Sequence, residues 1–100
     1  MDFSSAFREL RQGKLITRRT WTKKYLYMVP SSAFTPTRSP LSDICPKDKY
    51  VWHDAHIDMI TDGGKIITQW AIEHGDLFAD DWESFSLTEY KEVEGEGKRP

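Results

Sequence analysis

Apolar and polar residues recur with a helical period at the start of the chain. Four apolar residues fall at positions i, i+3, i+4 and i+7, namely Phe3, Ala6, Phe7 and Leu10. Asp2 or Ser4 can cap the first turn, and Gly13 stands where the last turn requires a left-handed residue. The pattern predicts an amphipathic helix of about ten residues, which must pack on another element because it is too short to be stable alone.

After Gly13 the pattern predicts strands, because β-branched and aromatic residues alternate loosely with polar ones between glycines and prolines. The predicted strands span residues 14–19, 25–29, 51–60, 66–70 and 82–90. Asp62, Gly63 and Gly64 predict a hairpin turn between the third and the fourth strand. Residues 31–50 contain three prolines and predict a long loop, and residues 71–81 predict a short helical piece with a turn at positions 75–76.

This order of elements predicts an α+β fold, in which an antiparallel sheet carries an N-terminal helix and a short second helix. Residues 1–90 are expected to form a single small domain, since 100 residues suit one domain rather than two. The highly charged residues 91–100, which include Gly95 and Gly97, are expected to form a flexible tail.

The composition is that of a globular protein, with 38% hydrophobic and 30% charged residues. No apolar run approaches the roughly 18 residues that cross a bilayer, and the first ten residues lack the apolar core of a signal peptide. Cys45 is the one cysteine, which excludes an intrachain disulfide and fits a reducing cytosol. We therefore expect no membrane partner.

Charge is divided unevenly along the chain, although the net charge is only −2. Residues 1–50 hold ten basic and four acidic side chains, whereas residues 51–100 hold four basic and twelve acidic ones. Halves of opposite charge can attract each other within one subunit or between two. Two interpretations stay open at this point: an ordinary surface with locally sorted charge, or a basic segment at residues 8–24 that faces an anion.

The chain offers little for metal or catalytic chemistry. On a strand, Asp54, His56 and Asp58 would share one face and could ligate a metal, but no second histidine or cysteine cluster completes such a site. A Cys45–histidine pair would have to be assembled by folding alone. The segment 63–65 is too short for a phosphate-binding loop. We therefore expect no metal, no cofactor and no catalytic residue.

Four tryptophans and four tyrosines are many for 100 residues. Aromatic rings stack on nucleobases and arginines pair with phosphates, but a small α+β core also recruits aromatic residues for their large buried area. For Trp82, which follows two aspartates, we favour a core position. For Trp21, which follows a pair of arginines, and for Trp70, composition leaves base stacking and core packing equally open.

Several short motifs, taken in order, carry a resemblance to a known family. They are Gly13-Lys14, Arg18-Arg19-Thr20-Trp21, Tyr25-Leu26-Tyr27, the loop segment 34–41, His56-Ile57-Asp58-Met59, and Trp70 followed by residues 76–82. Spread over residues 3–83, they resemble the small phage proteins known as Thoeris anti-defence sponges of the second type. The chain departs from the family pattern at Thr22-Lys23, Thr37, Gln69 and residues 73–75.

The resemblance implies a binder rather than an enzyme. Similar proteins form homo-oligomers, in which dimers pair into tetramers, and they sequester cyclic nucleotide immune signals in pockets at subunit interfaces. The signals are glyco-cyclic ADP-ribose and, in some members, cyclic di- or oligonucleotides. The implied setting is the host cytoplasm, with no DNA or RNA partner.

The resemblance also implies site residues for this sequence. Trp21 and Trp70 are expected to stack on base or ribose, Arg18 or Arg38 to meet phosphate, Asp76 to accept hydrogen bonds from ribose hydroxyls or a base edge, and Tyr27 and Met59 to form apolar walls. Two other classes of protein stay open. A signal-degrading enzyme would need a general base or a metal, which only His53, His56 and Asp58 could supply. A phage interaction module would bind a host protein through the acidic half of the chain.

Overall fold

The computed structural model describes residues 1–45 and 49–90, and it has the α+β fold that the sequence predicts. In this part of the chain, four helices accompany a five-stranded and a two-stranded sheet, in both of which all neighbouring strands are antiparallel. The elements are α1 (Phe3–Arg11), β1 (Leu15–Arg18), β2 (Tyr25–Val29), β3 (Ser32–Phe34), α2 (Leu41–Ile44), β4 (Val51–His53), β5 (His56–Ile60), β6 (Ile66–Ile67), α3 (His74–Leu77), β7 (Trp82–Phe85) and α4 (Leu87–Tyr90). The tail expected over residues 91–100 lies outside the described residues.

Helix α1 forms where the apolar periodicity predicts it. The Asp2 side chain accepts a hydrogen bond from the backbone N–H of Ser5 at 2.8 Å, which satisfies one of the free donors of the first turn. Gly13 follows the C-terminal end with a φ of 91°, a left-handed conformation that glycine adopts without strain. Ala6 and Leu10 on the inner face are fully buried.

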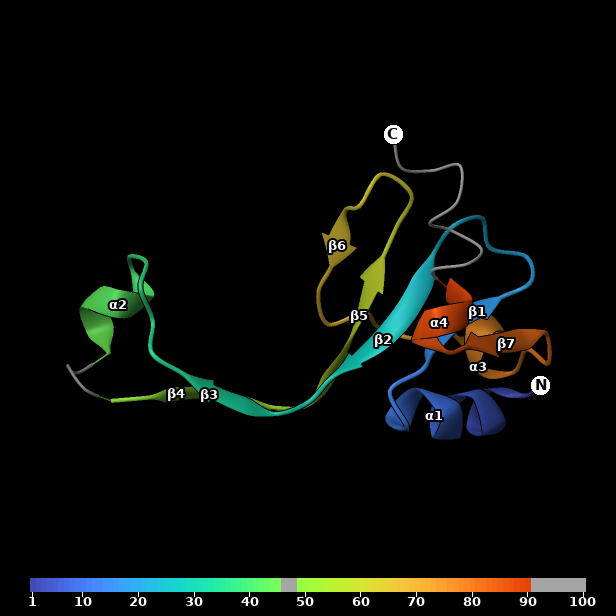
Figure 1. Ribbon diagram of the computed structural model, residues 1–100, viewed down its shortest axis with the longest axis horizontal. Coiled ribbons are helices and arrows are strands. Elements are labelled where there is room, and N and C mark those ends of the chain that lie inside the picture. Colours follow the sequence, from blue (N-terminus) through green and yellow to red (C-terminus); the bar gives the residue numbers. More distant parts are fainter. Residues whose placement is uncertain (46–48, 91–100) are drawn as a thin grey trace.

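The core lies between α1 and one face of the larger sheet, whose strand order is β6-β5-β2-β1-β7 (Figure 1). Ile16, Leu26 and Met59 lie opposite one another on β1, β2 and β5, and all three are buried. Burial of each large apolar side chain contributes roughly 1.5–3 kcal/mol. This row and the neighbouring Trp82 therefore form the stable centre of the molecule.

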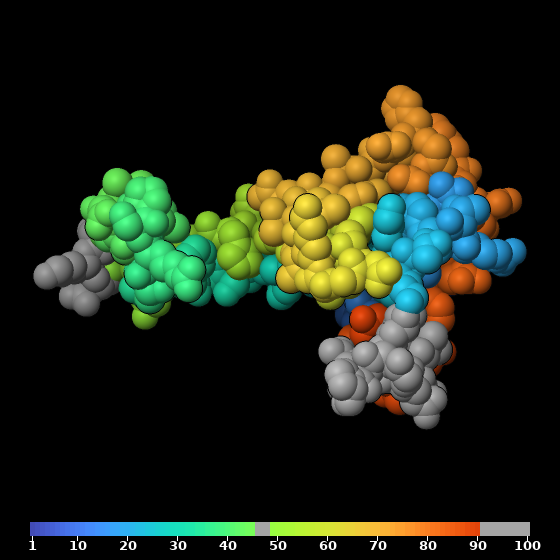
Figure 2. Space-filling model, turned by 90° about the horizontal axis from the view of Figure 1, so that it is seen from above, coloured from blue at the N-terminus to red at the C-terminus, as the bar shows by residue number. Residues whose placement is uncertain are grey.

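Residues 31–45 and 49–54, which we call the arm, stand away from the rest of the chain, which we call the body (residues 1–30 and 55–90). Strands β2 and β5 continue outward into the two-stranded sheet β3–β4, and α2 lies at the far end (Figure 1). From the orthogonal direction the arm again projects from the body, here as a separate lobe (Figure 2). The expectation of a long loop over residues 31–50 is thus wrong for β3 and α2, which are ordered elements inside that range.

Some predicted strands are interrupted or shorter than the sequence pattern indicates. Residues 51–60 form two strands in different sheets, because the chain leaves the ladder at Asp54 and Ala55. Residues 66–70 are a strand only at Ile66–Ile67, because Gln69 takes a positive φ that an extended strand does not allow. The turn expected at positions 75–76 is wrong as well, since both residues belong to helix α3. The hairpin turn at residues 62–64 is confirmed, with positive φ at both of its glycines.

The last predicted strand, over residues 82–90, ends at Phe85 and gives way to helix α4. Ser86 and Glu89 explain the change, because they form a reciprocal capping box. The backbone N–H of Ser86 donates to Glu89 Oε1 at 2.8 Å, and that of Glu89 donates to Ser86 Oγ at 3.1 Å. In residues 1–45 and 49–90, no helix combines the length and the apolar character that crossing a bilayer requires.

Candidate functional site

Trp21, Trp70 and Trp82, which we call the tryptophan cluster, come together from three distant parts of the chain. The ring centroids of Trp21 and Trp82 are 5.3 Å apart and those of Trp21 and Trp70 are 5.9 Å apart, both in edge-to-face geometry. Pairs of this kind contribute about 0.5–1.5 kcal/mol each beyond the area that they bury. The cluster therefore joins the turn after β1, the segment after β6 and the start of β7 into one aromatic unit.

The three rings differ in how far they are buried. Trp82 is 1% exposed, and its indole N–H donates to the carbonyl oxygen of Asp76 at 2.8 Å, which confirms the core position that the sequence favours. Trp21 and Trp70 are only partly buried, and both pack against the core from outside. The cluster thus has one structural member and two members that keep part of their surface accessible.

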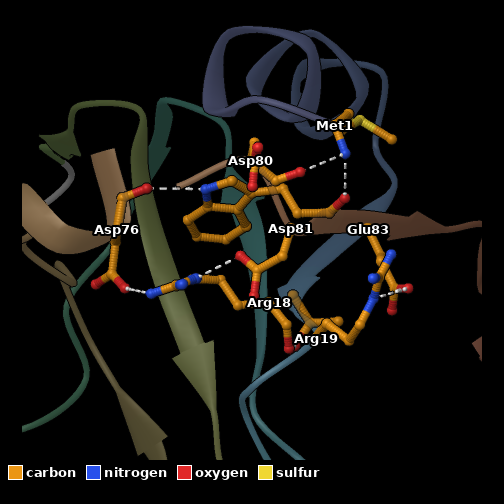
Figure 3. Close-up of polar contacts among 9 residues, drawn as sticks. Met1, Arg18, Arg19, Asp76, Asp80, Asp81 and Glu83 are labelled. Carbon is orange, nitrogen blue, oxygen red and sulfur yellow. Dashed lines mark hydrogen bonds and ion pairs between the residues drawn. The ribbon is translucent and has the colours of Figure 1, made fainter. Parts of the chain in front are cut away.

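Arg18 lies between two carboxylates beside this cluster (Figure 3). Its Nη1 is 2.8 Å from Asp76 Oδ1 and its Nε is 2.8 Å from Asp81 Oδ1, and the three side chains are 14–20% exposed. Arg18 is the last residue of β1, Asp76 belongs to α3, and Asp81 directly precedes β7. The guanidinium group therefore ties α3 to the sheet, while the Trp82 N–H holds the backbone of the same helix.

This pairing shifts the pKa values of two of the partners. The hydrogen bonds to Asp81 and then to Asp76 raise the pKa of Arg18, against the opposing effect of burial. The hydrogen bond from Arg18 lowers the pKa of Asp81. The fork of Arg18 is thus directed at protein carboxylates within the subunit. The predicted contact of Arg18 with a ligand phosphate stays a prediction.

The same close-up shows how the start of strand β7 is held (Figure 3). The amino group of Met1 donates to the carbonyl oxygens of Asp80 and Trp82 at 3.1 and 2.8 Å. Arg19 Nε is 3.5 Å from Glu83 Oε2, an ion pair that is exposed and therefore contributes little. These contacts fix the strand that carries Trp82.

A pocket of about 470 Å³ opens beside Trp70. This volume lies within the range of small-molecule binding sites. Apolar side chains form most of its lining and two polar residues contribute to it: Phe7, Met28, Ala55, Ile57 and Trp70, with His56 and Gln69. Such a mixture suits a flat, partly polar ligand that stacks on an aromatic ring.

The buried carboxylate of Asp58 organises one side of this pocket. Asp58 is 7% exposed, and its Oδ1 accepts a hydrogen bond from the backbone N–H of Gln69 at 3.0 Å. The Nε2 of His56 lies 3.3 Å from the same oxygen, and the Nδ1 of His56 lies 2.8 Å from the carbonyl oxygen of Asp54. Asp54 belongs to no strand, so the shared strand face expected for residues 54, 56 and 58 is wrong at that residue. No cluster of three or more potential metal ligands is present in residues 1–45 and 49–90.

The structure brings some of the predicted site residues together and separates others. Trp21, Trp70, Arg18 and Asp76 lie in one region of the body. Met59 belongs to the core row and is 5% exposed, and Tyr27 lies on the opposite face of the sheet, where burial and then the charge of Asp58 raise its pKa.

Arg38 is exposed and belongs to the arm, which projects away from the body that carries this region (Figure 1). Sequence reasoning did not place Met28, Ile57, His56 and Gln69 in the pocket. Met28 and Ile57 are cross-strand partners on the same face of the sheet as Leu26 and Met59. The alternation of side chains along a strand was therefore the sequence signal that could have placed Met28 and Ile57 on this face.

These features define a small α+β domain whose candidate site is an aromatic pocket beside Trp70, linked through the tryptophan cluster to an Arg–Asp pair. Residues 1–85 match the family model described as the Thoeris anti-defense 2-like domain, and the chain therefore belongs to this family. The match supports a phage anti-defence role and confirms the resemblance noted from the motifs. A search of curated proteins finds no match.

Proposed function

We propose that this protein is a phage anti-defence sponge, which binds a cyclic nucleotide immune signal and holds it without chemical change. The observation that carries the proposal is the pocket beside Trp70, whose ring packs on Trp21 within the part of the chain that matches the anti-defence family. Two partly exposed tryptophans suit base or ribose stacking, which is worth roughly 1–3 kcal/mol per base.

The Arg–Asp pair gives this site its polar side. Asp76 Oδ1 is bound by Arg18, which fixes the carboxylate so that its other oxygen can accept hydrogen bonds from ribose hydroxyls or a base edge. Nanomolar affinity corresponds to about −12 kcal/mol. We infer that stacking, a few charge-assisted hydrogen bonds and phosphate contacts from Arg38 of a second subunit together supply it. Tyr27 and Met59, which the resemblance implies as apolar walls, stay predictions, because neither lines the pocket beside Trp70 within the described part of the subunit.

Binding without turnover fits the geometry of His56 better than hydrolysis does. Hydrolysis of the signal needs a positioned base or a metal that activates water. His56 is the candidate base, but its two ring nitrogens already face the Asp54 carbonyl and the Asp58 carboxylate. The ring is thus oriented by the protein rather than toward a water in the pocket, which supports a non-catalytic role.

We further propose that the protein is a homo-oligomer that assembles through the arm in the host cytoplasm. Three large side chains of the arm stay mostly uncovered in the single subunit: Ile44 is 75%, Trp52 73% and Tyr50 67% exposed. Trp52 lies opposite Ala33 in the β3–β4 ladder, so its large ring has a small cross-strand neighbour. Exposed tryptophans and tyrosines of this kind are typical of interface hot spots.

Native mass spectrometry tests the proposal directly. The protein is mixed with glyco-cyclic ADP-ribose or with cyclic dinucleotides, and we expect oligomers whose mass increases by the mass of bound ligand. The Trp70→Ala variant is the control and should keep the oligomer while a smaller fraction of it carries the added mass at limiting ligand concentration. An oligomer that shows no mass shift with any of these signals would favour the interaction module instead.

A further inference from the structure

Gln69 adopts a backbone conformation that is energetically unfavourable for a residue with a side chain. Its φ is 53°, and apart from glycines only Lys23 shares a positive φ in the described residues. For a residue other than glycine, asparagine or aspartate, this left-handed region costs energy because the Cβ crowds the neighbouring carbonyl. Strain of this kind persists only where surrounding contacts enforce it, and it is concentrated at functional sites.

Two hydrogen bonds enforce the conformation. The N–H of Gln69 donates to the buried Asp58 Oδ1 at 3.0 Å, and the N–H of Trp70 donates to the carbonyl oxygen of Ile57 at 2.8 Å. Both partners belong to strand β5, so the segment is held against the edge of the sheet. The result is that Trp70 and Gln69 both line the pocket of about 470 Å³.

Gln69 is also the pocket residue whose polar group is uncommitted. The other polar residue of the lining is His56, and both of its ring nitrogens face acceptors of the protein. The carboxamide of Gln69 makes no hydrogen bond or ion pair within residues 1–45 and 49–90. Gln69 is exposed, so its two N–H donors and its carbonyl oxygen can turn toward whatever occupies the pocket.

We propose that Gln69 is the specificity-determining residue of the Trp70 pocket and that it reads the edge of an adenine-like base stacked on Trp70. A carboxamide matches the N6/N7 edge of adenine because its oxygen accepts from the exocyclic N6 amine while its nitrogen donates to N7. On that edge hypoxanthine presents a carbonyl oxygen and N7, which are both acceptors, so the carboxamide oxygen meets no donor and the two-bond match is lost. The inference rests on the proposed function, and it specifies the part of the signal that this pocket recognises.

The experiment compares glyco-cyclic ADP-ribose with the same molecule carrying hypoxanthine in place of adenine, by titration calorimetry on full-length protein. We expect the wild-type protein to prefer the adenine form by roughly 5- to 150-fold, the discrimination of one bidentate contact. Gln69→Gly removes the side chain and relieves the positive φ, so its melting temperature should be unchanged or higher while the preference disappears. Gln69→Asn also tolerates this φ and should keep a reduced preference.

Each outcome has a separate meaning. A Gln69→Gly protein that is as stable as the wild type but binds both probes equally supports the inference. A Gln69→Gly protein that keeps the preference, or a wild-type protein that binds both probes equally, overturns it and leaves the sponge function intact. A folded wild-type protein that binds neither probe contradicts the proposed function itself.

Discussion

The body and the arm differ in how far their large apolar side chains are buried. In the body, Leu10, Ile16, Leu26 and Trp82 are at most 1% exposed and pack in one core. In the described residues of the arm, no side chain of β3, β4 or α2 is buried. The body thus has its own source of stability, whereas the arm has the composition of an interface without a partner in the single chain.

The shape of the subunit follows from this difference. Its radius of gyration is 16.3 Å, against roughly 13 Å for a compact chain of 100 residues, and the long axis of 46 Å follows the arm (Figure 1). A protruding two-stranded sheet is marginal in water unless another surface covers it. The comparison teaches that ligand binding should depend on the body and assembly on the arm.

The largest expected effect comes from removing the arm. Val29 and His56 lie directly opposite each other in the β2–β5 ladder, so the arm, together with the flanking Pro30 and Ala55 of the body, can be replaced by Asn-Gly, a two-residue hairpin turn. We expect a folded body that no longer associates, because the exposed side chains that we propose as the interface are gone. Sedimentation velocity measures this, and an oligomer that survives the replacement would contradict the assignment of assembly to the arm.

A substitution in each region sharpens the contrast. Trp82→Ala removes the buried member of the cluster and should lower the free energy of unfolding by about 3–5 kcal/mol. Trp52→Ala on the arm removes a side chain that is 73% exposed, and it should leave the unfolding of the dissociated subunit nearly unchanged. Urea denaturation at low protein concentration measures both. If both variants lost the same free energy of unfolding, the arm would be packed within the subunit.

A smaller effect is expected from Trp70→Ala, because its ring is only partly buried. Loss of one stacking contact should weaken binding of glyco-cyclic ADP-ribose by about 1–3 kcal/mol, and the melting temperature should fall less than for Trp82→Ala. Phe78→Ala is the matched control, since Phe78 is an 82% exposed aromatic residue of the body outside the Trp70 pocket. If both variants bind like the wild type, Trp70 is not a ligand residue.

The smallest expected effect is a pH dependence from the Arg18–Asp81 pair. The folded state lowers the pKa of Asp81 below its ordinary value of 3.8, so the pair adds stability above that pH. This stability is lost as the pH falls through the lowered pKa. Asp81→Asn should therefore be less stable than the wild type at neutral pH and equally stable in strong acid. If the difference in stability between Asp81→Asn and the wild type stayed constant over this pH range, the charge of Asp81 would not be its cause.

The body was largely predictable from the sequence because its signals are local. The apolar stripe and Gly13 define α1, and the glycines at positions 63 and 64 define the hairpin. In the arm, β3 and α2 could not be predicted, because three prolines interrupt the segment and β3 pairs with residues about twenty positions away. The Ser86–Glu89 capping box was a readable signal that the strand-like pattern of residues 82–85 outweighed.

The candidate site was predictable only in part, for a different reason. The motifs indicated Trp21, Trp70, Arg18 and Asp76, but they could not show that Arg18 binds Asp76 rather than standing alone. That ion pair joins positions 58 residues apart, and only the fold sets its geometry. The sequence marked Gln69 only as a departure from the family pattern, because its positive φ accompanies a hydrogen bond to the distant Asp58 side chain.

Recovery of the ligand tests most directly the central claim that the body holds a signal without altering it. The protein is saturated with glyco-cyclic ADP-ribose, freed of excess ligand and heat-denatured, and the supernatant is analysed by mass spectrometry and by activation of the signal's effector. We predict intact ligand that activates the effector again. A cleaved product that accumulates beyond one equivalent per site, and that His56→Ala or a chelator abolishes, would contradict the account and make the protein an enzyme.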